Sequence, residues 1–313
     1  MTISSATPTG GRRSAPEPAV GAGRQADSRR RVVSRLASGI LTAPGLALLV
    51  LLAAGPLIAL VIDGFTTDST GFTLENFADT LGSAVFVKQL VRTVIVALIV
   101  TVASMALSWP AAWALGRYVP ARTRQVVLGI ALVPFITSQL LLMYGFMTLT
   151  QPKGPLMSLL AVVGVDSGSS LLYTPVATVL MLIYESIPTA VLVLTAASTQ
   201  IDESVLESAR VLGAGRLRVF GTVIWPLSVR MVGVNFGLTF VMTIGAFAEP
   251  AILGGPNGQL VGNVIQSQLS SGVGQHSATA LSLLLLVIAL VVVGVVAGAL
   301  SLTGGDSPEK ETP

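Results

Sequence analysis

Cysteine is absent from the 313-residue chain, and histidine occurs once, as His276. Without cysteine there is no disulfide framework and no thiolate chemistry. One histidine is too few for a histidine-based metal site, so no metal is expected. Charge is also scarce: 11% of the residues are charged, against about 25% in a soluble domain. An intramembrane enzyme is disfavoured as well, because no metal cluster, cysteine nucleophile or Ser–His pair is available.

Long apolar runs take the place of the missing charge, with 52% hydrophobic residues and a mean hydropathy of +0.80. A helix needs about 20 apolar residues to cross a bilayer. The runs are continuously apolar and do not alternate, which favours helices over a β-barrel. The sequence therefore predicts an all-α polytopic membrane protein with six transmembrane helices, over about 37–62, 89–116, 126–149, 175–200, 231–253 and 277–302.

Two polar tails flank the predicted membrane domain of residues 38–303. Residues 1–37 are rich in Pro, Gly, Ser and Arg and are predicted to form a disordered basic cytoplasmic tail. Residues 304–313 are predicted to form a cytoplasmic C-terminal tail. All but three of the 18 Lys and Arg residues fall on the side of the two termini. Because basic residues concentrate on the cytoplasmic side, both termini are predicted to be cytoplasmic in a multi-pass plasma or inner membrane protein.

A polar segment, residues 201–230, separates the fourth and fifth apolar runs. Its pattern predicts one helix starting near Asp202, a break at Gly213 and Gly215, and a second helix from about Leu217 toward Pro226. A helix, a glycine turn and a helix form a rigid protrusion from the membrane on the cytoplasmic side.

This segment resembles the EAA loop of ABC importer permeases, whose pattern is Glu-Ala-Ala, three residues, Gly, nine residues and Ile-x-Leu-Pro. Four positions match, Glu207, Ala209, Gly213 and Pro226, while Ser208, Val223 and Trp225 replace Ala, Ile and Leu. The stretches VPFITSQLLLMYGFMTL (133–149) and GAFAEPAILGGPNGQLVGNVIQSQL (245–269) resemble polyamine-type permeases of this family. The likeness covers about residues 40–303. An arginine often follows P-F-x-T-S in those relatives, and none is present here.

The resemblance implies the type I ABC importer permease fold and a transport subunit that is not itself an enzyme. Consistently, the chain has no G-x-x-x-x-G-K-[ST] phosphate loop. The implied partners are an ATP-binding ABC subunit that uses ATP, a second and homologous permease, an extracytoplasmic solute-binding protein and membrane lipid, with no nucleic acid. Residues 201–230 would be the coupling loop, docking on the ATPase through Glu207, Ser208, Ala209, Gly213, Val223 and Pro226. Pro226 would end the second helix before the fifth span.

Charged residues inside the predicted spans mark the candidate substrate path. Glu185 lies in the fourth span and Glu249 in the fifth, where carboxylates are costly unless they face a cavity or a partner. Two acids suit a cation such as a polyamine, and Tyr144 and Tyr184 could add cation–π or hydroxyl contacts. Pro188 and Pro250 could break their helices near the path. Ferric iron, thiamine, sulfate and opine-type solutes remain open, as does an ion-driven secondary transporter that uses Glu185.

Overall fold

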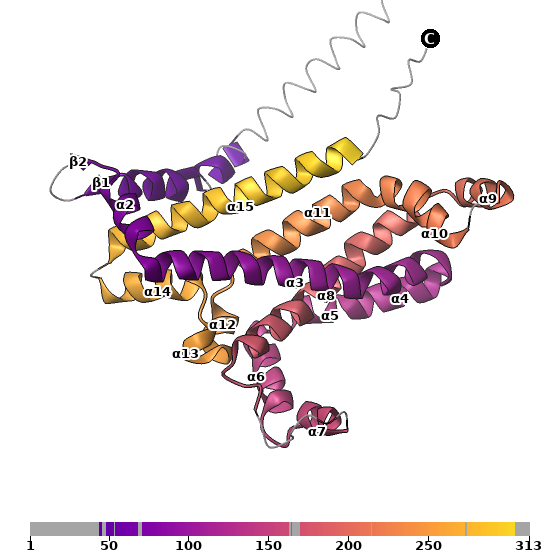
Figure 1. The fold of residues 1–313 in the computed structure, drawn as a ribbon, viewed down its shortest axis with the longest axis horizontal. Coiled ribbons are helices and arrows are strands. Elements are labelled where there is room, and N and C mark those ends of the chain that lie inside the picture. The colour runs from indigo at the N-terminus through magenta and orange to yellow at the C-terminus, as the bar shows by residue number, and fades with distance from the viewer. Residues whose placement is uncertain are drawn as a thin grey trace, which may run out of the picture. The chain divides into compact units, whose positions relative to one another are not determined.

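Figure 1 shows the computed structural model of the chain. It describes residues 44–45, 48–52, 54–67, 71–162, 164, 170–213, 215–272 and 274–303. The two predicted tails, residues 1–37 and 304–313, lie outside the described residues. The pattern of contacts between residues divides the chain into two compact units, Met1–Ala59 and Leu60–Pro313. The fold described below is that of the second unit.

Long helices dominate the described residues, which confirms the all-α class. In the described part of the chain, four helical stretches are long and apolar enough to cross a bilayer: α3 (Ala84–Arg117), α8 (Pro175–Thr199), Phe220–Ile244 with α11 (Trp225–Ile244) as its main part, and α15 (Gln275–Thr303). The first, second and fourth of these agree with the predicted second, fourth and sixth spans, whereas the third overlaps the predicted fifth span but begins and ends about ten residues earlier. A shorter apolar helix, Leu48–Gly64, lies in the first predicted span. With one bent pair counted as a fifth span, the described residues do not confirm a total of six.

The spanning helices pack around α3 and α11. Helix α3 lies along α8, and α11 contacts α3, α8 and α15 (Figure 1). One buried cluster joins Ala97 of α3, Phe240 of α11 and Ala289 of α15. Small residues at such contacts let helix backbones approach closely, which is the main source of packing between helices in lipid.

Helices α3 and α8 pack tightly at Gly116, where a larger residue does not fit. A Cβ atom there would overlap the Ser198 hydroxyl and lie 2.9 Å from Ser198 Cβ. We expect Gly116→Ala to lower the free energy of unfolding by about 1–3 kcal/mol, the usual cost of overpacking. Thermal unfolding of the detergent-solubilised protein measures this change. Gly129→Ala is the matched control: Gly129 is also inside a helix, a Cβ there meets nothing within 4 Å, and we expect a gain of about 0.5–1 kcal/mol.

The predicted third span is not one helix. The chain forms α4 (Ala121–Ala131), α5 (Val133–Ile136) and α6 (Gln139–Thr150), and the two halves are bent by 98°. The bend falls at Thr137 and Ser138, whose ψ angles of 140° and 129° are not helical. Hydropathy alone missed this bend because residues on both sides of it are apolar. Helix α7 (Pro155–Ala161) follows α6.

The predicted fifth span is also broken, and not at Pro250. Helix α11 ends at Ile244, and α12 (Ala248–Leu253) begins after a short non-helical link. The side chain of Asn263 holds this link: its amide Nδ2 donates to the Phe247 carbonyl at 2.7 Å, and its Oδ1 accepts from the Leu260 N–H at 3.0 Å. Non-helical backbone at membrane depth is tolerated where protein satisfies it in this way.

Short elements close the end of the bundle away from the coupling loop. Helices α13 (Gly255–Gly258) and α14 (Val261–Ser271) follow α12. Strands β1 (Thr66–Thr67) and β2 (Gly71–Phe72) form an antiparallel pair in which Thr66 faces Phe72, and α2 (Glu75–Gly82) leads into α3. In Figure 1 these strands and α14 lie at the opposite end from α9 and α10.

The coupling loop contains the helix–turn–helix that its pattern predicts. Helix α9 (Glu203–Val211) ends near Gly213, which has a φ of +77° that favours glycine. Helix α10 (Arg216–Val219) continues through a π-helical turn, η1 (Phe220–Ile224), directly into α11. Pro226 therefore does not end the second helix, contrary to the prediction. The Trp225 N–H bonds back five residues to the Phe220 carbonyl, and this wider turn lets the helix pass into Pro226 without a break.

Candidate functional site

The two broken helices meet α8 at a cavity of about 470 Å³. Its walls come from α5 and the start of α6, from the middle of α8, and from the end of α11 with the link to α12. The lining residues are Pro134, Phe135, Thr137, Gln139, Leu142, Leu182, Glu185, Ser186, Thr189, Thr239, Met242, Thr243, Gly245, Ala246, Phe247, Ala248 and Glu249. The breaks thus bring polar side chains and non-helical backbone to the wall of a cavity between apolar helices, as expected of a transport path.

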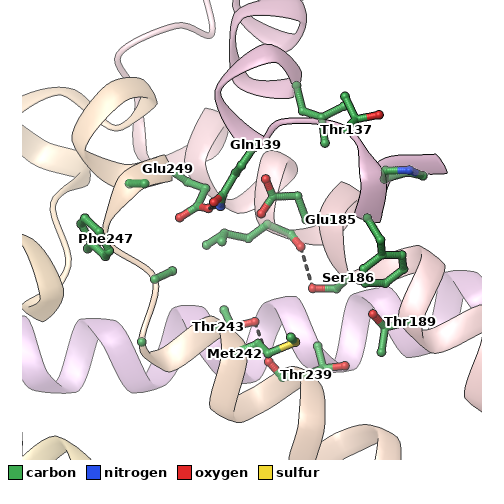
Figure 2. Close-up of a pocket in the computed structure, with 17 residues that line it drawn as sticks. Thr137, Gln139, Glu185, Ser186, Thr189, Thr239, Met242, Thr243, Phe247 and Glu249 are labelled. Atoms are coloured by element: carbon green, nitrogen blue, oxygen red, sulfur yellow. Dashed lines mark hydrogen bonds between the residues drawn. The ribbon is translucent and has the colours of Figure 1, made fainter. Parts of the chain in front are cut away.

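Two carboxyl groups and one amide form the polar centre of the cavity. The Gln139 amide Nε2 donates to Glu249 Oε1, and Glu249 is only 3% exposed. Figure 2 shows the Glu185 carboxyl group beside this pair. Glu185 Oε1 is buried, and the Glu185 carboxyl group interacts with Glu249 and Gln139. Among the described residues, no Lys or Arg lines the cavity, so its charge is negative wherever these acids are ionised.

Hydroxyl-bearing residues of α8 and α11 also line the cavity. Ser186 and Thr189 come from α8, and Thr239 and Thr243 come from α11 (Figure 2). The Ser186 hydroxyl donates to the Leu182 carbonyl at 2.7 Å, and the Thr243 hydroxyl donates to the Thr239 carbonyl at 2.7 Å. Their protons are thereby used within their own helices, so the oxygens can accept from a ligand. The cavity therefore offers acceptors to a donor-rich solute.

Only part of the predicted substrate path lies at this cavity. Glu185 and Glu249 line it, but Tyr144 and Tyr184 do not and are 63% and 44% exposed. Neither proline breaks its helix, contrary to the prediction. Helix α8 runs unbroken through Pro188, because its other backbone hydrogen bonds and the neighbouring helices hold it. Pro250 lies inside α12.

Sequence reasoning missed three kinds of lining residue: Gln139, the hydroxyl residues of α8 and α11, and the aromatic residues Phe135 and Phe247. Gln139 had a usable signal, since an amide directly after Thr137-Ser138 in an apolar run is as unusual as a carboxylate. The hydroxyl residues had none, because Ser and Thr occur throughout the chain and are common in membrane helices. Among the described residues, no three His, Asp or Glu side chains gather to hold a metal ion.

The coupling loop is the second candidate surface, and α3 holds it in place. Ile201, Leu206, Val219 and Ile224 form a buried cluster against Trp109 and Trp113 of α3. Arg117, at the end of α3, donates from Nη2 to the Ile201 carbonyl, and its guanidinium lies 5.2 Å from the centre of the Trp113 ring. The loop is therefore packed against α3 as well as joined to α11.

The tip of the loop faces outward. Glu207, Ser208 and Gly213 are exposed, whereas Ala209 and Val223 are half-buried toward the cluster. Val211 and Leu212, which the sequence pattern did not single out, are each 86% exposed. The solvent-exposed apolar side chains of Val211 and Leu212, beside the exposed carboxylate of Glu207, are typical of a surface that contacts another protein. In Figure 1, α9 stands at one extreme of the bundle.

A bundle of membrane helices with a polar cavity at broken spans and a rigid protruding loop defines a membrane transport protein. The model of the family of binding-protein-dependent transport system inner membrane components matches residues 108–301. The chain belongs to this family, and it is a permease subunit of an ABC importer, a transport component and not an enzyme. The ion-driven secondary transporter is thereby excluded as an alternative.

The relatives include polyamine permeases. The chain is 35% identical to the spermidine/putrescine transport system permease protein PotB of Escherichia coli (strain K12) over 200 residues, which are 63% of this chain and 71% of that protein. It is 30% identical to PotB of Haemophilus influenzae over 220 residues, which are 68% of this chain and 76% of that protein.

A solved structure shares the fold. The chain matches the crystal structure of a bacterial alginate ABC transporter in complex with an alginate pentasaccharide-bound periplasmic protein with a TM-score of 0.71 and 18% sequence identity, over 88% of this chain and 97% of that one. The fold is that of the type I ABC importer permeases, as the resemblance implied.

Proposed function

We propose that this permease imports a small cationic solute of the polyamine type. The observation that supports this most directly is the cavity, which holds Glu185 and Glu249 and no basic residue. A carboxylate and an ammonium group attract each other strongly in a half-buried site, and the hydroxyl oxygens accept the remaining amine protons. The 35% identity to a spermidine/putrescine permease supports the same class of solute.

The cavity argues against one of the alternatives that the sequence left open. Sulfate would meet two carboxyl groups and no Lys or Arg, and like charges disfavour binding. Thiamine and ferric iron are cations, so the charge of the cavity does not separate them from polyamines. Opine-type solutes carry both signs, and their carboxylates would have no basic partner in the lining.

ATP supplies the energy through a separate subunit in this proposal. That ABC subunit binds the tip of the coupling loop through Glu207 and the motif residues Ser208, Ala209 and Gly213, with Val223 and Pro226 holding the loop's second helix. No cofactor is bound by this chain itself. A second, homologous permease completes the path, and a solute-binding protein delivers the solute at the opposite end. Both chain termini and the loop then lie in the cytoplasm.

Uptake into proteoliposomes tests the solute class. We expect the permease, assembled with its partner permease, ATPase and solute-binding protein, to accumulate radiolabelled putrescine or spermidine when ATP is enclosed with the ATPase. Unlabelled thiamine, ferric iron and sulfate, each at a hundredfold excess, should leave this uptake unchanged. ATP-dependent uptake of thiamine, iron or sulfate, without uptake of polyamine, would contradict the proposal.

A further inference from the structure

A row of polar side chains runs along the face of α11 that packs against α3 and α8. Ser228, Asn235, Thr239 and Thr243 are all buried, and successive members lie seven, four and four residues apart. Residues at this spacing share one face of a helix. Val232 fills the remaining turn of the row and packs against Ala112 of α3 and Ala190 and Leu194 of α8.

Asn235 is the member of this row that packing does not explain. Its side chain is 0% exposed, and among the described residues neither its Oδ1 nor its Nδ2 has a hydrogen-bond partner. The hydroxyls of Thr239 and Ser228 are likewise buried without a partner in the described part of the chain. Leaving a buried amide unpaired destabilises a fold, whereas an apolar side chain of similar shape would be neutral or better.

The position of Asn235 connects it to the cavity. Thr239 lines the cavity, and Asn235 lies four residues before it, about 6 Å further along the helix axis toward the coupling loop. Val232, about one turn beyond Asn235, is held by α3 and α8. Thr239 is thus the lining residue of α11 nearest the coupling loop, and Asn235 lies about one helical turn beyond it.

The π-helical turn η1 is a point at which the rotation and the axial position of α11 relative to the coupling loop can change. A π-helical turn contains an extra residue compared with an α-helical turn. If η1 closed to α-helical geometry, the helix beyond it would turn by about 100° and shift by about 1.5 Å. On another side of α11, Gly233 and Gly237 face Leu300 and Val293 of α15, so α11 and α15 pack closely at these two positions.

We propose that Asn235 is a second contact for the transported cation, one helical turn beyond the cavity, and that it is uncovered when α11 moves with the coupling loop. Its Oδ1 then accepts from an amine of the solute that has left Glu185 and Glu249. This proposal rests on the proposed function, because the ligand is the same cation. It extends the substrate path by one residue, Asn235, on the coupling-loop side of the cavity. The path reaches this residue only after α11 has moved.

Single cysteines test the uncovering of Asn235, and the cysteine-free chain gives no background from this subunit. The Asn235→Cys variant, in the full transporter with the partner subunits' own cysteines replaced, is treated with methanethiosulfonate ethylammonium, without nucleotide and with a non-hydrolysable ATP analogue. We expect at least a tenfold difference in labelling rate between the two states. Val229→Cys, equally buried on α11, is the control that stays unlabelled, and Thr239→Cys marks the cavity.

Protection by putrescine separates the two proposals. If putrescine slows labelling at both Thr239→Cys and Asn235→Cys, both proposals hold. If it protects Thr239→Cys while Asn235→Cys reacts no faster than Val229→Cys in either state, Asn235 is not on the path and this inference fails alone. If Asn235→Cys is labelled in one state but putrescine protects neither position, the solute class is wrong and with it the ligand assigned to Asn235.

Replacement by leucine separates transport from structure. We expect Asn235→Leu to unfold at the same or a higher temperature, because it removes an unpaired amide from an apolar site, and to lower putrescine uptake at least fivefold. A purely structural Asn235 would move only the unfolding temperature. Wild-type uptake by a stable Asn235→Leu transporter would overturn the proposal.

Discussion

Replacing Glu249 by glutamine is expected to lower the kcat/KM of putrescine uptake at least about 30-fold. Truncating one partner of a buried, hydrogen-bonded charge pair costs about 2–5 kcal/mol, and each 1.4 kcal/mol is about a factor of ten. Glu249 is 3% exposed and accepts a hydrogen bond from Gln139, and in the proposed function its charged partner is the ammonium group of the solute. Glutamine keeps the shape and one oxygen acceptor, so the change removes the charge and little else. The measurement is initial uptake as a function of putrescine concentration in proteoliposomes.

Glu75→Gln is the matched control for this prediction. Glu75 is an exposed acid at the start of α2, so its variant loses the same charge from the chain without touching the cavity, and we expect wild-type uptake. An unchanged kcat/KM in Glu249→Gln, with the control also unchanged, would show that the cavity charge does not select the solute. Unfolding temperatures of both variants show whether a loss of uptake reflects a loss of fold.

Glu185→Gln allows the two acids to be compared. Residues in contact usually give non-additive effects, and a double-mutant cycle measures the coupling between them. If both carboxyl groups bind one ammonium group, the double variant will lose little more uptake than the worse single variant. If each binds a separate ammonium group of a diamine, the two losses will multiply. The cycle therefore reports how the cation lies in the cavity.

The fold class and part of the site followed from the sequence because they depend on local patterns. Apolar runs of sufficient length identify helices, and α3, α8 and α15 agree with them within a few residues. An acid in an apolar run is conspicuous, which is why Glu185 and Glu249 were predicted. The glycine at position 213 was predicted to make a turn for a similar reason, since its neighbours are helix formers.

The partners of these residues could not be predicted, because they are set by tertiary structure. Gln139 and Glu249 are 110 residues apart in the chain, and only the bends in two spans bring them together. Those bends are held by distant contacts, such as Asn263 on the Phe247 carbonyl. Hydropathy averages over a window and does not register a break of two or three residues. The unpaired state of Asn235 is likewise visible only when its neighbours are known.

The coupling loop carries the second large expected effect. We expect Glu207→Arg to raise the dissociation constant between the permease and its ATPase at least tenfold, measured by co-purification and by binding in detergent. Glu207 is exposed on α9, near the bare side chains of Val211 and Leu212. Reversing its charge puts repulsion where an attraction is proposed, and like-charge contacts across an interface weaken binding strongly. Because the side chain has no described role within this chain, the fold should be unaffected.

Glu203→Arg decides whether position or charge carries this effect. Glu203 is exposed, lies one turn earlier on the same face of α9, and falls outside the motif. Equal losses in both variants would mean that the net charge of the loop attracts the ATPase, and the motif assignment would fail. A loss confined to Glu207→Arg would place the contact at the motif.

Gly213 provides a test of the loop's geometry, because its φ of +77° suits Asn but strains a β-branched residue by about 1–2 kcal/mol. Gly213→Asn should therefore keep the ATPase bound and Gly213→Val should not, since the turn sets the angle at which α9 meets its partner.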